Sequence, residues 1–370
     1  MKLKDIGKIV TGKTPSTKQL ENFSELDDKY LFVTPRDMKD NCKYIESTER
    51  YLTSFVEDKF KSQIIKKDSV CISCIGSDMG KVYMINRPGI TNQQINSITA
   101  IKDICNPHYL YYYFSDKKEY LKGIAGGSTM PILNKSTFEN IEIDLPARNI
   151  QDKIVKILNN IDNKIELNNK TNDNLLELIK KLYIEKIKNN NDINFEEKNL
   201  DEFCNIFTGK KNANASEENG QYKFFTCAPE PLSINSYIYD GPAVIVAGNG
   251  AYTGRTNFYN GKFDLYQRTY GITTNNDYIY LFYAMIYTDL QNDIMGGTHG
   301  SAIPYIVMND IAKFKVKYNK ELFDELSQKI KVLLLKIKSN EAQNETLEQL
   351  RDTLLPKLMN GEIDLDKIEI

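Results

Sequence analysis

The chain has 370 residues, of which 41% are hydrophobic and 26% are charged, which predicts a folded protein of two or three domains and excludes a largely disordered chain. No apolar run approaches the ~18–20 residues that cross a membrane, and the first ten residues lack the apolar core of a secretory signal, so we expect a cytoplasmic protein. The formal net charge is -2, so any binding site for a polyanion must gather its positive charge on one face.

Seven short segments of the first half of the chain recur in the same order in the second half. The first combines an acidic residue, an apolar pair and Thr-Gly-Lys, and it occurs in residues 3–13 and again in 200–210. No single match is long, but a conserved order of matches indicates an internal duplication. The other six pairs are 30–34 with 222–226, 70–75 with 244–247, 76–81 with 248–255, 92–94 with 266–268, 107–116 with 277–289, and 126–131 with 296–304.

The repeated segments also predict local structure in each globular half. The apolar runs 70–75 and 244–247 have the composition of buried β-strands, and each breaks into a glycine-rich turn that ends in Gly-Lys or Gly-Arg. Residues 107–116 and 277–289 predict a short helix rich in tyrosine in each half. Both halves are therefore expected to contain a sheet with glycine turns followed by a helix.

A long heptad pattern follows each globular half. Apolar residues or asparagines recur at alternating steps of four and three, which is the spacing of a coiled-coil seam. The two patterns have the same phase, and each carries two asparagines in its middle. The predicted seam residues are Ile154, Leu158, Ile161, Ile165, Asn168, Asn172, Leu175, Ile179 and Leu182 in the first helix, and Leu326, Ile330, Leu333, Ile337, Asn340, Asn344, Leu347, Arg351 and Leu354 in the second.

Each predicted helix has one apolar stripe that must be buried, and we expect the two stripes to pack against each other. A buried amide without a partner costs about 1–3 kcal/mol. Antiparallel pairing that places Asn168 near Asn344 and Asn172 near Asn340 satisfies all four amides. Because each helix follows an equivalent globular half, this direction also gives the chain a pseudo-two-fold axis. The alternative is that each helix packs on its own globular half.

Two globular units, each followed by a heptad helix, resemble the specificity subunits of type I restriction–modification systems. Short sequence motifs in residues 5–16, 127–135 and 354–363 are also similar to motifs of that family, and the resemblance covers nearly the whole chain. It implies two target-recognition domains that each read one half of a bipartite DNA site. It also implies that the helices set the spacer between the half-sites, dock two methyltransferase subunits and allow a motor-nuclease restriction subunit to join.

We therefore predict an α+β fold in which two similar target-recognition domains are joined by two long helices that form an antiparallel coiled coil, with a pseudo-two-fold internal repeat. The chain is expected to be a non-catalytic subunit without a cofactor, and S-adenosylmethionine is expected on the partner methyltransferase subunit. The alternative function is a coiled-coil scaffold that does not bind DNA. The predicted segments are 1–148 and 195–320 for the target-recognition domains, 149–190 and 321–360 for the helices, and 361–370 for the C-terminal tail.

Three motifs that can signal catalysis or metal binding have simpler explanations here. Residues 7–14 match the spacing of a phosphate-binding loop, but that loop needs a preceding strand and a following helix, and Pro15 follows it. Cys71 and Cys74 lack the second ligand pair that a structural zinc needs, so we expect them in the core. His108 is expected to pack or lie at the surface. We predict no catalytic residues and no metal site.

The predicted DNA contacts are long polar side chains beside glycine turns. Arg and Lys can read guanine, Asn and Gln can read adenine, and all of them can hold phosphates. The second unit departs from the family phrase, with Lys211-Asn212 in place of Thr-Pro and a longer loop at 296–304, which fits two domains that read different half-sites. The candidates are Lys13, Thr14, Arg36, Lys39, Ser77, Lys81, Gln93, Gln94, Ser128 and Thr129 in the first domain, and Lys210, Lys211, Asn249, Tyr252, Arg255, Gln267, Arg268, His299 and Ser301 in the second. The helical tyrosines Tyr109, Tyr111, Tyr112 and Tyr113 are expected in the core instead.

Overall fold

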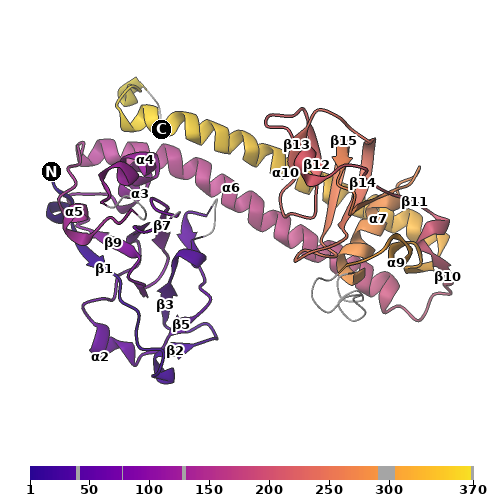
Figure 1. The fold of residues 1–370 in the computed structure, drawn as a ribbon, viewed down its shortest axis with the longest axis horizontal. Helices are drawn as coiled ribbons and strands as arrows, with labels where there is room; N and C mark the ends of the chain where they lie inside the picture. Colours follow the sequence, from indigo (N-terminus) through magenta and orange to yellow (C-terminus); the bar gives the residue numbers. More distant parts are fainter. Residues whose placement is uncertain (39–41, 77, 127–130, 291–304, 368–370) are drawn as a thin grey trace. The chain divides into compact units, whose positions relative to one another are not determined.

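The computed structural model describes residues 1–38, 42–76, 78–126, 131–290 and 305–367 (Figure 1). The chain forms two compact units, one of Met1–Glu166 with Asn344–Ile370 and one of Leu167–Gln343. Two long helices, α6 (Arg148–Tyr183) and α10 (Lys320–Met359), each contribute to both units. Within the described ranges, no helix is both long and apolar enough to span a bilayer.

The main sheet of the first unit has the strand order β1-β9-β6-β7-β4. All neighbouring pairs are antiparallel except β4 and β7, which run parallel. Tyr109, Leu110 and Phe114 pack one face of the sheet and belong to the same buried cluster as Leu158 of α6. The bounds are α1 Leu3–Ile6, β1 Gly7–Thr11, β4 Tyr44–Ile45, β6 Val70–Ser73, β7 Val82–Ile85, β9 Ile95–Ala100, α3 Pro107–Asp116, α4 Lys118–Ile124 and α5 Lys135–Glu139.

A smaller four-stranded sheet in the first unit, of order β2-β5-β3-β8, lies over its own buried cluster of Tyr30, Phe32, Leu52, Val56 and Ile90. Its strand β3 pairs in parallel with β8. The parallel pair places the end of β3 beside the turn that follows β8, where Asn92 N donates to Val33 O at 2.8 Å. The bounds are β2 Phe23–Ser24, β3 Tyr30–Val33, β5 Tyr51–Leu52, α2 Val56–Phe60 and β8 Gly89–Thr91.

The second unit contains a six-stranded sheet of order β11-β16-β14-β15-β12-β13 and a separate two-stranded sheet of β10 and β17. Helix α7 covers the large sheet and continues into a π-helical turn, Ile286–Leu290. The bounds are β10 Glu196–Asn199, β11 Asn205–Thr208, β12 Tyr222–Phe225, β13 Leu232–Ile234, β14 Tyr239–Ala247, β15 Thr256–Leu265, β16 Thr269–Thr273, α7 Tyr278–Met285, α9 Met308–Ala312 and β17 Lys315–Tyr318.

The strands β1-β9-β6-β7 of the first domain and β11-β16-β14-β15 of the second have the same order and matching register, which confirms the α+β fold and the internal repeat. Val70 pairs with Ile98 in the first domain, and Val244 pairs with Ile272 in the second. The parallel pairs agree as well, since Val33 faces Thr91 and Phe225 faces Leu265. These are the residues that the sequence repeat aligns. The domains differ between the matched strands, where the first carries β4, β5 and α2 and the second carries β13.

The repeated Thr-Gly-Lys segment depends on a close backbone approach. A Cβ atom on Gly12 would lie 2.0 Å from the carbonyl oxygen of Asn92, and a Cβ on Gly209 would lie 1.7 Å from that of Leu265. Only a residue without a side chain fits at that distance. Each glycine therefore allows the chain leaving β1 or β11 to pass directly against the turn that precedes β9 or β16, the strand with which it pairs.

The two long helices run antiparallel within each unit, as predicted. In the second unit Asn340 Nδ2 donates to Asn172 Oδ1 at 2.8 Å, and Asn168 Nδ2 donates to Gln343 Oε1 at 2.9 Å. In the first unit Arg351 lies 3.3 Å from Asp162. The helices also pack on their own globular domains, so the alternative packing is present alongside the coiled coil. The predicted proximity of the Asn168 and Asn344 side chains stays a prediction.

The predicted seam is wrong at the end of α6. Leu182 is half-buried and lies outside the buried cluster, whereas Ile179, Tyr183 and Ile187 belong to it. The buried residues of this segment recur every four residues instead of at alternating steps of four and three. Helix α6 then continues into a π-helical turn, Ile184–Lys188. The physical reason is that this part of the helix packs against the second domain as well as against α10. In α10, Leu334 is likewise buried more deeply than the predicted Leu333.

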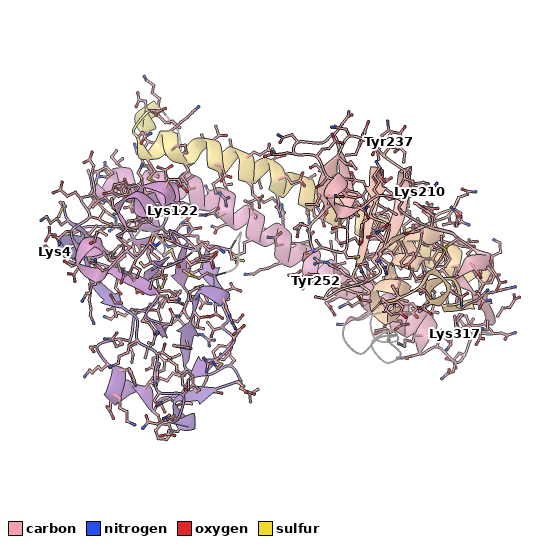
Figure 2. All side chains as sticks on the ribbon, in the orientation of Figure 1. Lys4, Lys122, Lys210, Tyr237, Tyr252 and Lys317 are labelled. Atoms are coloured by element: carbon pink, nitrogen blue, oxygen red, sulfur yellow. The ribbon has the colours of Figure 1, made fainter. Side chains whose placement is uncertain are left out.

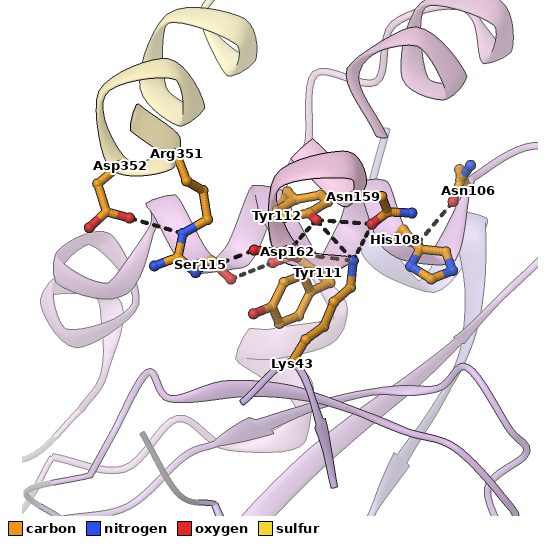
Figure 3. A network of polar contacts seen from close by, with 10 residues as sticks. All are labelled: Lys43, Asn106, His108, Tyr111, Tyr112, Ser115, Asn159, Asp162, Arg351 and Asp352. Carbon is orange, nitrogen blue, oxygen red and sulfur yellow. Dashed lines mark hydrogen bonds and ion pairs between the residues drawn. The ribbon is translucent and has the colours of Figure 1, made fainter. Parts of the chain in front are cut away.

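A buried polar network fixes the first domain on the helices (Figure 3). The Tyr112 hydroxyl lies 2.5 Å from Asp162 Oδ2 and 2.9 Å from Asn159 Oδ1, and Lys43 Nζ donates to Asn159 and to Tyr112. Burial lowers the pKa of Lys43 to about 8, although Asp162 and Glu166 oppose that shift. Asp162 and Arg351 carry the network across both helices. The second domain is attached by different contacts, including two hydrogen bonds of 2.9 Å from Lys331 to Asp277.

Alanine at Gly12 or at Gly209 should destabilise the protein by at least about 2 kcal/mol, because the new methyl group must displace a backbone carbonyl. Alanine at Gly123 is the matched control, since that glycine lies in helix α4 with open space around it and the change should gain up to about 1 kcal/mol. Urea unfolding measures the differences. Equal midpoints for G12A and G123A would contradict the close approach.

Replacement of Asn172 by Ala should cost about 1–3 kcal/mol, because the buried amide of Asn340 then loses its partner. The double variant N172L/N340L should recover most of that loss, since no polar group is left unpaired. The exposed Asn163 on the same helix provides the control N163A, which should change stability by less than about 0.5 kcal/mol. A double-mutant cycle in urea measures the coupling, and a coupling energy near zero would refute the pairing.

Candidate nucleic-acid interface

In the first domain, three segments meet at one end of the main sheet. Cys74 N donates to Gln94 O at 2.8 Å and Gly12 N donates to Ile95 O at 3.0 Å, which joins the three segments through their backbones. Thr14 Oγ1 also donates to Gln93 Oε1 at 2.7 Å. We call this set, comprising residues 12–14, 76–81 apart from residue 77, and 92–94, the first rim.

The second domain repeats this arrangement. Gly248 N donates to Arg268 O at 2.8 Å, and Gln267 N donates to Lys211 O at 2.9 Å. We call residues 209–211, 248–255 and 266–268 the second rim. Backbone hydrogen bonds hold the segments together in both rims, so the side chains they carry project from a fixed platform.

The hairpin turns of the two rims have the same backbone geometry. Gly80 N donates to Ser73 O and Gly254 N donates to Ala247 O, both at 2.8 Å. Gly80 and Gly254 have φ angles of 83° and 82°, which lie in the left-handed region that favours glycine. These matched hydrogen bonds, together with those of Cys74 to Gln94 and of Gly248 to Arg268, define equivalent positions in the two rims. Lys81 corresponds to Arg255, Asp78 to Tyr252 and Gln94 to Arg268.

The first rim contains several of the predicted contacts, but some of them are already engaged. Lys13 is exposed with its Nζ 6.0 Å from the centre of the Phe60 ring, and Gln93 is exposed. Lys81 Nζ lies 3.1 Å from Asp78, and Gln94 accepts a hydrogen bond from Asn92. Arg36 is exposed but follows β3 outside the rim as defined. Lys39, Ser77, Ser128 and Thr129 lie outside the described residues.

In the second rim some of the predicted DNA contacts are exposed at the surface, and others contact neighbouring side chains of the same domain. Lys210 and Tyr252 lie at the surface (Figure 2), and Gln267 and Arg268 are exposed. Asn249 Oδ1 lies 3.0 Å from the sulfur of Cys227. The Arg255 guanidinium lies 5.8 Å from the centre of the Tyr252 ring. His299 and Ser301 lie outside the described residues.

Lys211 is the predicted contact whose charge is neutralised within the domain. Its Nζ lies 2.8 Å from Asp264 Oδ2 and also donates to Ser236, and Asp264 is buried at 4% exposure. A buried carboxylate requires such a partner. This pair could not be predicted from the sequence, because Asp264 is 53 residues away near the end of a strand.

Sequence reasoning also missed Cys227, which lies in the second rim region. Its sulfur lies 3.3 Å from Arg268 O as well as close to Asn249. The internal repeat could have indicated this position. Thr34 aligns with Thr226, so residue 227 lies just beyond the end of β12, the strand that pairs in parallel with β15. Cys227 therefore helps to fix the backbone at Arg268.

The motifs with simpler explanations are structural. Gly7–Thr11 forms strand β1, and the next helical segment is the short 3-10 helix Leu20–Asn22, so residues 7–14 do not form a phosphate-binding loop. Cys71 and Cys74 are buried, and burial raises the pKa of both thiols. Among the described residues, no group of three or more His, Cys, Asp or Glu side chains could hold a metal ion. His108 packs edge-on against Tyr44, and Tyr109 and Tyr112 are buried.

Replacement of Lys211 by Ala should destabilise the protein by about 1–3 kcal/mol, because the buried carboxylate of Asp264 loses its cation. The neighbouring exposed Lys210 gives the matched control, and K210A should change stability by less than about 0.5 kcal/mol. Thermal unfolding of both variants measures the difference. If the two variants melt together, the ion pair with Asp264 is not important for stability.

Comparison with known proteins agrees with this architecture. Residues 1–177 and 192–349 each match the type I restriction modification DNA specificity domain. The chain is 29% identical, over 99% of its length and 94% of the relative's, to the type I restriction enzyme MjaIX specificity subunit of Methanocaldococcus jannaschii. It is 37% identical, over 44% of its length and 37% of the relative's, to the EcoDI specificity subunit of Escherichia coli.

A solved structure has the same fold. The crystal structure of the type I restriction-modification S subunit from M. genitalium matches with a TM-score of 0.59 at 16% identity, and the match covers 97% of this chain and 95% of that one. Because the family match extends over both repeats and most of the sequence, the chain belongs to the family of type I restriction modification DNA specificity domains.

Proposed function

We propose that this chain is the DNA-reading specificity subunit of a type I restriction–modification enzyme, and that each globular domain reads one half of a bipartite site. The observation that supports the proposal most strongly is the duplication of the rim. The strand orders β1-β9-β6-β7 and β11-β16-β14-β15 match, and each domain brings three segments together at one end of its sheet, with Cys74 N to Gln94 O and Gly248 N to Arg268 O as equivalent bonds. Base readout needs polar side chains held at fixed positions, and the rims provide them.

The electrostatics of the rims support this assignment despite the overall charge. The chain carries a net charge of -2, which is unfavourable for binding a polyanion without local organisation. Lys13 in the first rim, and Lys210 and Arg268 in the second, are exposed basic side chains on the rims that also carry the predicted amide contacts. Phosphate contacts of this kind fix the register of a protein on DNA, whereas the amides can read bases.

The two helices are proposed to set the spacer and to dock two methyltransferase subunits. Large apolar side chains are exposed on their outer faces, away from the seam, with Val332 67% and Leu178 44% exposed. Exposed apolar side chains on a helix are suited to packing against partner helices. Under this proposal the chain has no catalytic residue of its own, and S-adenosylmethionine binds the methyltransferase partner. A restriction subunit would complete the nuclease.

Sequencing of modified bases in genomic DNA tests the proposal directly. Cells with this gene should methylate one bipartite motif, and cells without it should lose methylation at that motif only. The purified complex with its methyltransferase subunits should bind that DNA with an affinity that falls steeply as salt rises, because phosphate contacts release counterions.

Two results would count against the proposal. An unchanged methylation pattern after deletion would favour the scaffold alternative, in which the helices recruit partners without DNA. Methylation of DNA by the isolated chain would show that the catalytic residues lie in this subunit. Restoring the gene from a plasmid is the control, and it should restore the same motif.

A further inference from the structure

The equivalent positions Gln94 and Arg268 carry different chemistry on the same backbone platform. Gly248 N donates to Arg268 O and Cys74 N donates to Gln94 O, both at 2.8 Å, so the two residues occupy matching places in the two rims. From this match, and resting on the proposed function, we infer that Arg268 is the specificity-determining residue of the second domain and that it reads a guanine.

The backbone around Arg268 is held on several sides. Tyr266 N donates to Phe225 O at 2.9 Å, Gln267 N donates to Lys211 O at 2.9 Å, and Thr269 N donates to Tyr266 O at 2.9 Å. The sulfur of Cys227 adds a contact to the carbonyl oxygen of Arg268 itself. A side chain that reads a base must start from a fixed Cα, and this turn meets that requirement.

The guanidinium of Arg268 is available for a ligand. The side chain is exposed, and it has no hydrogen bond or ion pair with any residue in the described part of the chain. The other guanidinium of the second rim is placed differently, because Arg255 lines a hollow of the same unit with Leu334, Lys338 and Glu341 of α10. Lys211 is paired with Asp264. Arg268 is therefore the exposed guanidinium among the described residues of this rim, whereas Arg255 is half-buried beside the Tyr252 ring.

The chemistry of the guanidinium selects guanine. Its two parallel N–H groups match the O6 and N7 acceptors that guanine presents in the major groove. Adenine presents a donor in place of the O6 acceptor, so the same pair of hydrogen bonds cannot form. The first domain has no guanidinium at the matching place, and the amide of Gln94 accepts a hydrogen bond from Asn92 at 3.0 Å. The two half-sites therefore differ at the matching position.

The test compares the methylated motifs of cells that carry the wild-type chain, R268A or R268Q. In the wild type one half-site should contain a guanine that both variants no longer require, and preference for it should fall about tenfold or more. The other half-site should stay unchanged. The control variant K210Q removes a neighbouring exposed charge, and it should weaken DNA binding evenly without changing the motif. Thermal unfolding of each purified variant shows whether it is folded.

The outcomes separate this inference from the proposed function. If the wild-type chain directs methylation of a bipartite motif but R268A and R268Q direct the same motif with the same base preferences, Arg268 does not determine specificity. A motif in which only a base other than guanine changes would overturn the assignment to guanine. Absence of any bipartite motif in wild-type cells would instead refute the proposed function.

Discussion

Each globular domain depends on the close approach of its first chain segment to a turn at the end of the sheet. Gly12 and Gly209 make that approach possible, because any side chain there would collide with a backbone carbonyl. The approach brings the segment after β1 or β11 beside the turn before β9 or β16, and the hairpin turn joins them through its own hydrogen bonds. The rims exist because backbone atoms of three distant segments can lie in direct contact. Their side chains are then free to vary.

This separation of platform and side chains explains how one fold can carry two specificities. The backbone hydrogen bonds that close the hairpin turn and join it to the turn before β9 or β16 are the same in both domains, whereas Lys81, Asp78 and Gln94 are replaced by Arg255, Tyr252 and Arg268. A duplicated domain that reads two different half-sites needs this property. The conserved glycine turns hold the position of each side chain, and the residue type at that position decides which donor or acceptor pattern it meets.

The attachment of each domain to the long helices uses polar contacts that are not repeated. In the first unit Tyr112, Asn159, Asp162 and Arg351 form a buried network, which a low-polarity environment makes costly to disrupt. In the second unit Lys331 pairs with Asp277, and Tyr183 hydrogen-bonds to Asp289. Burying such groups is acceptable only when each has a partner. The helices are therefore tied to their domains by specific side chains in addition to apolar packing.

The sequence alone determined the duplication, one buried strand and one tyrosine-rich helix within each repeat, and the antiparallel pairing of the long helices. These features follow from short-range periodicity and from the order of repeated segments, which are visible along the chain. The pairing of Asn172 with Asn340 was predictable because both residues interrupt an apolar seam. The tertiary structure decided which polar side chains are free. Lys211 is neutralised by Asp264, and Tyr183 replaces Leu182 in the buried cluster, because packing partners distant in sequence set the charge and burial at those positions.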